Sequence, residues 1–149
     1  MKELEEALRL EEEYLVEMAI INPSECNQLT IQVEIEQRNE GPIPHLHVYH
    51  DKTRNKKKCS YIRLDELDYA PHHIRIPLPR KLKKQFIYLM NLPADEYMKD
   101  KNGNIVELNG YQSAVRIWAN TFENKDLSKF NLDENGIPIT LDYKKLPSK

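Results

Sequence analysis

The chain has 149 residues, of which 40% are hydrophobic, and a net charge of −2. A chain of this length buries roughly 68–70% of its unfolded surface, so we expect a single domain over residues 1–149. No apolar run approaches the about 20 residues that span a bilayer, and the first six residues are acidic where a signal peptide would be basic and then apolar. Composition therefore argues against a membrane protein and predicts a cytoplasmic one.

The N-terminal segment has the pattern of an acidic helix. Leu4, Leu8, Leu15 and Met18 approximate one apolar stripe, which predicts a helix over roughly residues 3–20. Residues 1–17 carry seven acidic side chains against two basic ones. We therefore divide the chain into an acidic N-terminal helix (1–22), a core (29–122) and a tail (123–149).

Two alternating segments follow. Residues 29–36 and 45–49 each alternate apolar and polar side chains, and the breaker-rich segment 39–44 separates them, so we expect an antiparallel hairpin. Matching the apolar faces pairs Val33 with Val48, because a slip of one residue would turn every apolar side chain outward. This register predicts Glu34 opposite His47, and it predicts Glu36 opposite His45.

Two more strands are expected at residues 60–64 and 73–78, because both segments alternate. The predicted register puts Tyr61 beside Tyr49 and Arg63 beside His47. Periodicity near 3.6 then predicts a helix over residues 80–91, a turn at 100–104 and a second helix, while 139–141 suggests an edge strand before a loose end at 144–149. The apolar positions of the two helices are Leu82, Phe86, Leu89, Met90, Tyr111, Ala114, Val115, Trp118 and Phe122.

These elements define the expected fold class. The sequence predicts an α+β protein in which a small, mainly antiparallel four-stranded sheet carries helices packed on one face. The other face of the sheet collects polar side chains, and we take it as a candidate binding surface. Its members are Glu34, Glu36, His45, His47, Tyr49, Tyr61, Arg63, His73 and Arg75.

All five histidines lie within 29 positions, from residue 45 to residue 73. His45 and His47 share one face of a strand, and two imidazoles at that spacing suit a transition metal that finds further ligands. The candidate metal ligands are His45, His47, His73 and Glu34, for one divalent ion, zinc or manganese. The alternative is that no cofactor binds and the histidines hydrogen-bond to carboxylates or backbone.

Charge is segregated along the chain, because residues 52–84 hold eleven basic side chains against three acidic ones. Such a segment attracts nucleic acid, phosphorylated ligands or an acidic protein, and a solvated loop and helix face is the alternative interpretation. The predicted basic patch consists of Lys52, Arg54, Lys56, Lys57, Lys58, Arg80, Lys81, Lys83 and Lys84.

A family resemblance rests on two short motifs. Residues 44–48 read Pro-His-Leu-His-Val, and residues 78–81 read Leu-Pro-Arg-Lys at the start of the first expected core helix. Together with the later Trp118, they resemble the small bacterial and phage proteins grouped as domain of unknown function 4160, over roughly residues 29–122. The resemblance implies an accessory protein of a phage or mobile element, located in the host cell cytoplasm, and it names no reaction.

Three functions follow from these observations. The favoured one is a non-catalytic binding or regulatory module that recognises a protein or nucleic-acid partner through residues 52–84 and the polar sheet face. The alternative is a metal-dependent hydrolase or nuclease that uses the histidine cluster and a carboxylate such as Glu34. A third is a structural component of a larger assembly, because an acidic helix and a basic patch on one chain invite self-association. Metal content separates the first two functions.

Overall fold

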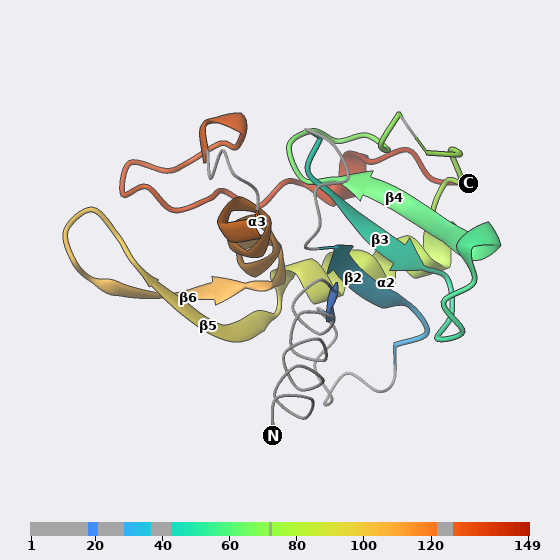
Figure 1. The fold of residues 1–149 in the computed structure, drawn as a ribbon, viewed down its shortest axis with the longest axis horizontal. Helices are drawn as coiled ribbons and strands as arrows, with labels where there is room; N and C mark the ends of the chain where they lie inside the picture. Colours follow the sequence, from blue (N-terminus) through green and yellow to red (C-terminus); the bar gives the residue numbers. More distant parts are fainter. Residues whose placement is uncertain (1–17, 21–28, 37–42, 72, 122–126) are drawn as a thin grey trace, which may run out of the picture.

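The computed structural model describes residues 18–20, 29–36, 43–71, 73–121 and 127–149, and these form an α+β structure (Figure 1). One antiparallel sheet has the strand order β1-β2-β3-β4, and a separate hairpin pairs β5 with β6. The strands are β1 (Met18–Ile20), β2 (Gln32–Glu36), β3 (His45–Tyr49), β4 (Cys59–Arg63), β5 (Pro93–Lys99) and β6 (Ile105–Asn109). The α-helices within the described ranges are α2 (Arg80–Asn91) and α3 (Gly110–Thr121).

The register predicted between the first two alternating segments is confirmed. Val33 pairs with Val48, and Glu34 pairs with His47. The apolar side chains of β2 and β3 are completely buried under the helices, whereas a one-residue slip would have placed them on the other face.

The predicted register of β4 was wrong by two residues. Tyr61 lies opposite His47, and Arg63 lies opposite His45. A slip of two keeps every side chain on its face, so alternation cannot detect it. The connecting loop sets the register: Asn55 caps the short 3-10 helix η2 (Lys56–Lys58), and the His50 amide donates to the Lys58 carbonyl at 2.8 Å.

The membership of the sheet also differs from the prediction. Residues 73–78 form no strand, because Pro77 cannot donate to a ladder and the Ile76 carbonyl accepts the Ser60 hydroxyl at 2.7 Å. The fourth strand is β1, which lies in the last three residues of the expected helix 3–20 and pairs with β2. Residues 3–17 of that expected helix lie outside the described ranges.

The core lies between the sheet and the two helices, and α2 crosses behind the sheet in Figure 1. Helix α2 has the predicted bounds, and it buries Phe86, Leu89 and Met90. Trp118 of α3 is 4% exposed, which confirms it as a core residue, whereas Phe122 lies outside the described ranges. Gly110 allows α3 to begin against α2, because a Cβ there would lie 2.5 Å from the Leu89 carbonyl oxygen.

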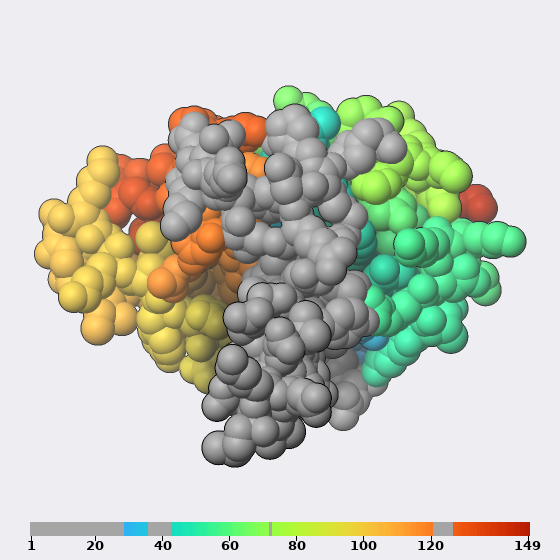
Figure 2. Space-filling view, in the orientation of Figure 1, coloured from blue at the N-terminus to red at the C-terminus, as the bar shows by residue number. Residues whose placement is uncertain are grey.

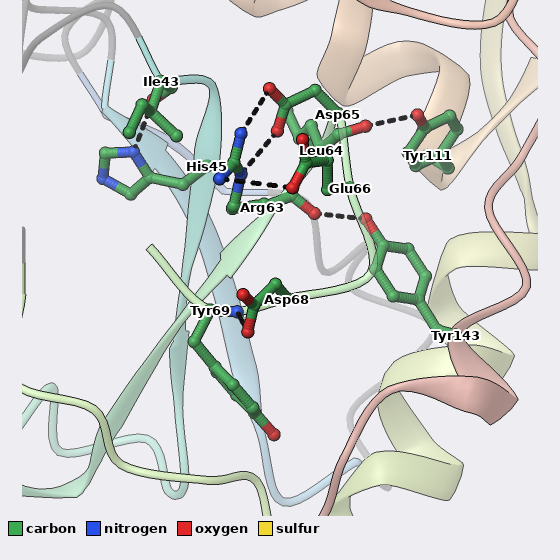
Figure 3. A network of polar contacts seen from close by, with 10 residues as sticks. All are labelled: Ile43, His45, Arg63, Leu64, Asp65, Glu66, Asp68, Tyr69, Tyr111 and Tyr143. Atoms are coloured by element: carbon green, nitrogen blue, oxygen red, sulfur yellow. Dashed lines mark hydrogen bonds and ion pairs between the residues drawn. The ribbon is translucent and has the colours of Figure 1, made fainter. Parts of the chain in front are cut away.

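The C-terminal segment is part of the core, so the expected loose end at 144–149 is wrong. Tyr143, in the 3-10 helix η4 (Tyr143–Lys145), and Leu146 are both buried. The Tyr143 hydroxyl donates to the Arg63 carbonyl at 2.7 Å, and the Tyr111 hydroxyl donates to the Leu64 carbonyl (Figure 3). These two bonds satisfy the backbone where the chain leaves β4. Residues 139–141 form no edge strand.

The hairpin β5–β6 was not predicted, although its turn at residues 100–104 was. The Asp100 carboxylate accepts the amides of Asn102 and Asn104, and Gly103 has a φ of +81°. The hairpin lies at one end of the molecule, and the basic loop around residues 50–58 lies at the other (Figure 2).

Candidate metal centre

Three of the candidate ligands come together. Each of His45, His47 and His73 offers a ring nitrogen, and these nitrogens all lie within 4.8 Å of one another. A tetrahedral ion with zinc–nitrogen bonds of about 2.0–2.1 Å needs ligand nitrogens about 3.4 Å apart. The imidazoles would therefore have to approach by at most about 1.4 Å, which is within the range of small side-chain rotations.

Two different kinds of backbone position these rings. His45 and His47 stand two residues apart on β3, so the strand projects both from one face, with ring centroids 5.3 Å apart. His73 belongs to the irregular segment that returns along β4, where the Ala70 amide donates to the Tyr61 carbonyl at 2.8 Å. The Tyr61 ring stacks on the His73 ring at 3.9 Å, and it contacts His47 edge-on at 4.9 Å.

The His45 ring is oriented by the backbone. Its Nδ1 lies 2.9 Å from the Ile43 carbonyl oxygen, which can only accept, so Nδ1 carries the proton of the neutral ring (Figure 3). The tautomer therefore presents the lone pair on Nε2. Histidines that bind metals usually donate their other nitrogen to a carbonyl or carboxylate in this way.

Glu34 supplies a buried carboxylate next to His47, because the two residues are cross-strand partners. Its side chain is 2% exposed, and its Oε1 forms an ion pair with Arg54 Nε at 3.1 Å and accepts from Gln32 Nε2 at 2.8 Å. The other oxygen, Oε2, is buried and accepts no hydrogen bond from the part of the chain that the structure describes. A buried carboxylate oxygen in this state favours a cation nearby.

The donor set discriminates between the two metals considered from the sequence. Imidazole nitrogen suits zinc, copper, iron and nickel, whereas manganese favours sites rich in oxygen. Glu34, the fourth candidate ligand, is not part of the cluster, and the three imidazoles fit zinc better than manganese.

The other residues of the predicted polar face do not join the cluster. Arg63 binds the Asp65 carboxylate through two nitrogens, at 2.8 and 2.9 Å, and Arg75 is exposed and pairs with Asp68. Tyr49 is buried beneath the Arg54 guanidinium, which lies 5.9 Å from its ring centroid. The side chain of Glu36 lies outside the described set. Across the face, His45 and His47 are buried, Tyr61, Arg63 and His73 are half-buried, and Arg75 is exposed.

His50 and Ser60 resemble a catalytic base with its nucleophile, but the direction of their hydrogen bonds excludes nucleophilic catalysis. His50 Nε2 lies 2.8 Å from Ser60 Oγ, and Ser60 Oγ donates its one proton to the Ile76 carbonyl at 2.7 Å. His50 must therefore donate to Ser60 and cannot take its proton. Ser60 is also completely buried, and burial lowers the pKa of His50. This pair is structural.

The predicted basic patch is exposed over most of its length. Lys52, Arg54 and the three lysines of η2 are exposed, and Arg54 also forms the ion pair with Glu34. Helix α2 carries the remainder of the patch, and its start lies at the same end of the molecule as the loop around residues 50–58 (Figure 1). Sequence reasoning missed that residues 140–148 lie along this helix and form hollows with it, lined by Tyr88 and Lys144 among others. The available signal was Tyr88, an aromatic residue outside the apolar stripe of the helix.

Comparisons with known proteins give no relative. No family model, no curated protein and no solved structure matches the chain. Neither helix in the described ranges is long and apolar enough to cross a membrane.

Proposed function

We propose that the protein is a zinc-dependent hydrolase whose ion is held by His45, His47 and His73. The observation that carries this proposal is the convergence of three ring nitrogens within 4.8 Å, from a strand and from the segment that returns beside it. Three neutral imidazoles leave one position of a tetrahedral ion for water, and such sites activate water for hydrolysis.

Glu34 is the residue that we assign to proton transfer. Its carboxylate lies one strand away from the histidines, and the Arg54 ion pair holds one of its oxygens while leaving Oε2 for a second interaction. A buried carboxylate within reach of the water would act as the general base, in the role that acidic residues commonly fill beside catalytic zinc. The proposal thus gives distinct tasks to four residues that the sequence analysis named together.

The test begins with stoichiometry. Protein purified with a chelator, dialysed and titrated with zinc by calorimetry should bind about one ion per chain. His73→Ala should abolish that binding, and His50→Gln, which changes a histidine outside the cluster and keeps a donor for Ser60, should retain it. No binding by the unaltered chain would overturn the metal site.

Activity is the second readout. The zinc-loaded chain should hydrolyse at least one member of a panel of chromogenic phosphodiesters, carboxylic esters and amides, and Glu34→Gln should lower kcat while zinc stoichiometry persists. Removing a positioned general base typically costs about 10²–10⁴-fold in rate. Zinc binding without hydrolysis of any substrate class would reject the hydrolase and leave a non-catalytic metal site.

A second function is favoured by one separate observation. Lys52 and the η2 lysines are exposed together on one loop, which supports a non-catalytic module for a nucleic-acid or acidic protein partner. We retain with it the proposal, implied by the resemblance to domain of unknown function 4160, of a cytoplasmic accessory protein of a phage or mobile element. Binding that weakens steeply with salt would support the module, and no binding to any polyanion at low salt would reject it.

A further inference from the structure

A continuous groove runs along the outer side of α2. Two hollows of about 260 and about 500 Å³ lie between this helix and residues 140–148, and they share Ile87 and Lys144 in their walls. The smaller hollow lies at the start of the helix and the larger one at its end. Helix α2 covers the apolar face of the sheet, so the groove and the histidine cluster lie on opposite sides of the sheet.

The smaller hollow is basic. Four cationic side chains line it, those of Arg80, Lys83, Lys84 and Lys144. Lys83 Nζ is fixed by the carbonyls of Lys144 and Leu146, both at 2.7 Å, so one cation is anchored in the wall while Arg80 and Lys84 are exposed. Such a cluster attracts anions, and the N-terminal end of α2 adds to the same positive potential.

The larger hollow offers an aromatic platform. Tyr88 lines it and is 57% exposed, so its ring is accessible to a ligand. Tyr88 follows Lys84 by four residues, so the two side chains lie one above the other on the helix, about 6 Å apart along its axis. This spacing places the Lys84 cation next to the Tyr88 ring, so that one nucleotide can contact Lys84 with its phosphate and Tyr88 with its base.

We propose that this groove binds single-stranded nucleic acid, with phosphates on the cations of the smaller hollow and a base stacked on Tyr88. A basic groove with an exposed aromatic ring is the combination by which proteins bind single strands without sequence preference. A duplex keeps its bases stacked inside and offers no ring to Tyr88, while an acidic peptide would use the cations and leave Tyr88 without a role. The inference rests on the second proposed function, because it assigns that module a site and a ligand, and it is independent of the metal.

The experiment measures fluorescence anisotropy of a labelled ten-nucleotide oligo-dT strand at low salt and at rising salt. Tyr88→Ala should weaken binding roughly tenfold, because it removes the ring on which a base stacks. Lys84→Ala should reduce the slope of log affinity against log salt by about 0.7, the value for one phosphate contact of a single strand. Tyr97→Ala and Lys99→Ala, which change exposed residues of β5, are the matched controls and should bind as the unaltered chain does.

Two further arms separate the possible failures. If the triple change of Lys56, Lys57 and Lys58 to Ala abolishes binding while Tyr88→Ala has no effect, the module stands and the groove is rejected. If the unaltered chain binds no strand at low salt, both the module and the groove are rejected. Equal affinity for a ten-residue poly-glutamate peptide that is unaffected by Tyr88→Ala would identify an acidic-peptide site and overturn the assignment to nucleic acid.

Discussion

Zinc should raise the melting temperature of the protein, and the rise should depend on His73. An ion that binds the folded chain and not the unfolded one stabilises it by RT ln(1 + [Zn]/Kd), which is about 2.7 kcal/mol at a hundredfold excess over Kd. One kcal/mol shifts the melting temperature of a chain of this size by about 2–4 °C. The expected rise is therefore about 8 °C.

The structure indicates what limits the affinity behind that rise. The ligand nitrogens must come from up to 4.8 Å to about 3.4 Å, and any turn of the His73 ring works against its stack on Tyr61 at 3.9 Å. Losing an aromatic stack costs about 0.5–1.5 kcal/mol, or up to about tenfold in Kd. Tyr61→Leu should consequently alter zinc affinity by no more than about tenfold, whereas His73→Ala removes a ligand and should abolish the response.

Calorimetric or fluorescence-monitored melting, with zinc at a hundred times the Kd measured by titration and with chelator as the reference, provides the measurement. His50→Gln is the matched control, because His50 lies outside the cluster, and it should retain the full rise. The reasoning fails if zinc leaves the melting temperature of the unaltered chain unchanged, or if His73→Ala responds as strongly as the unaltered chain.

Three further predictions concern the fold around the site. Tyr143→Phe leaves the Arg63 carbonyl without its donor and should lower the free energy of unfolding by about 1–3 kcal/mol in urea titration. The exposed Tyr97→Phe is the control, and a loss no larger than that of the control would contradict the hydrogen bond. Gly110→Ala should cost about 1–3 kcal/mol in the same assay, because its Cβ would meet the Leu89 carbonyl at 2.5 Å, whereas Asn120→Ala on the exposed face of α3 should be close to neutral. Burial lowers the pKa of His50 from its ordinary 6.5, so its contribution to stability is present above pH 6.5 and lost as pH falls through the folded value. In chelator, His50→Gln should therefore flatten the fall in unfolding free energy between pH 7.5 and 5, and an unchanged slope would refute that origin.

The elements that could be predicted are those for which the sequence pattern is compatible with a single arrangement. The pairing of β2 with β3 follows from matching apolar faces, and the bounds of α2 follow from Pro79 at its start and Pro93 after its end. The register of β4 was out of reach, because a slip of two residues preserves the pattern and the loop that decides it depends on the cap at Asn55.

The C-terminal segment shows a different limit. Tyr143 and Leu146 are isolated apolar residues in a polar stretch with no period, so nothing local marks them as core. Their burial depends on a surface made by β4 and α2, which are about 80 and 60 residues earlier in the chain. Contacts of that sequence separation leave no trace in a single sequence, and the hollows along α2 were missed for the same reason.

The candidate metal site contains one part that the sequence pattern predicts and one part that it does not. Alternation on β3 was enough to place His45 and His47 on one face, whereas the position of His73 depends on an irregular segment shaped by Pro77 and by the hydrogen bond from Ala70 to Tyr61. The sequence shows that His73 could bind a metal, but it does not show where the irregular segment places the ring. The three histidines could therefore be named as candidate ligands, whereas the distances between their rings could not be predicted.

Burial of the polar face is the strongest physical reason to expect an ion there. Antiparallel sheets commonly leave their polar face in water, yet Glu34, His45 and His47 are each at most 7% exposed. Polar groups removed from water destabilise the fold unless they find partners, and Glu34 Oε2 finds no hydrogen-bond donor among the described residues. A divalent ion beside the three imidazoles would offset the buried carboxylate charge and tie the segment carrying His73 to β3. An apolar replacement of Glu34 would remove that need for a cation, so zinc should raise the melting temperature of Glu34→Leu less than that of the unaltered chain, and an equal rise would contradict this role of Glu34.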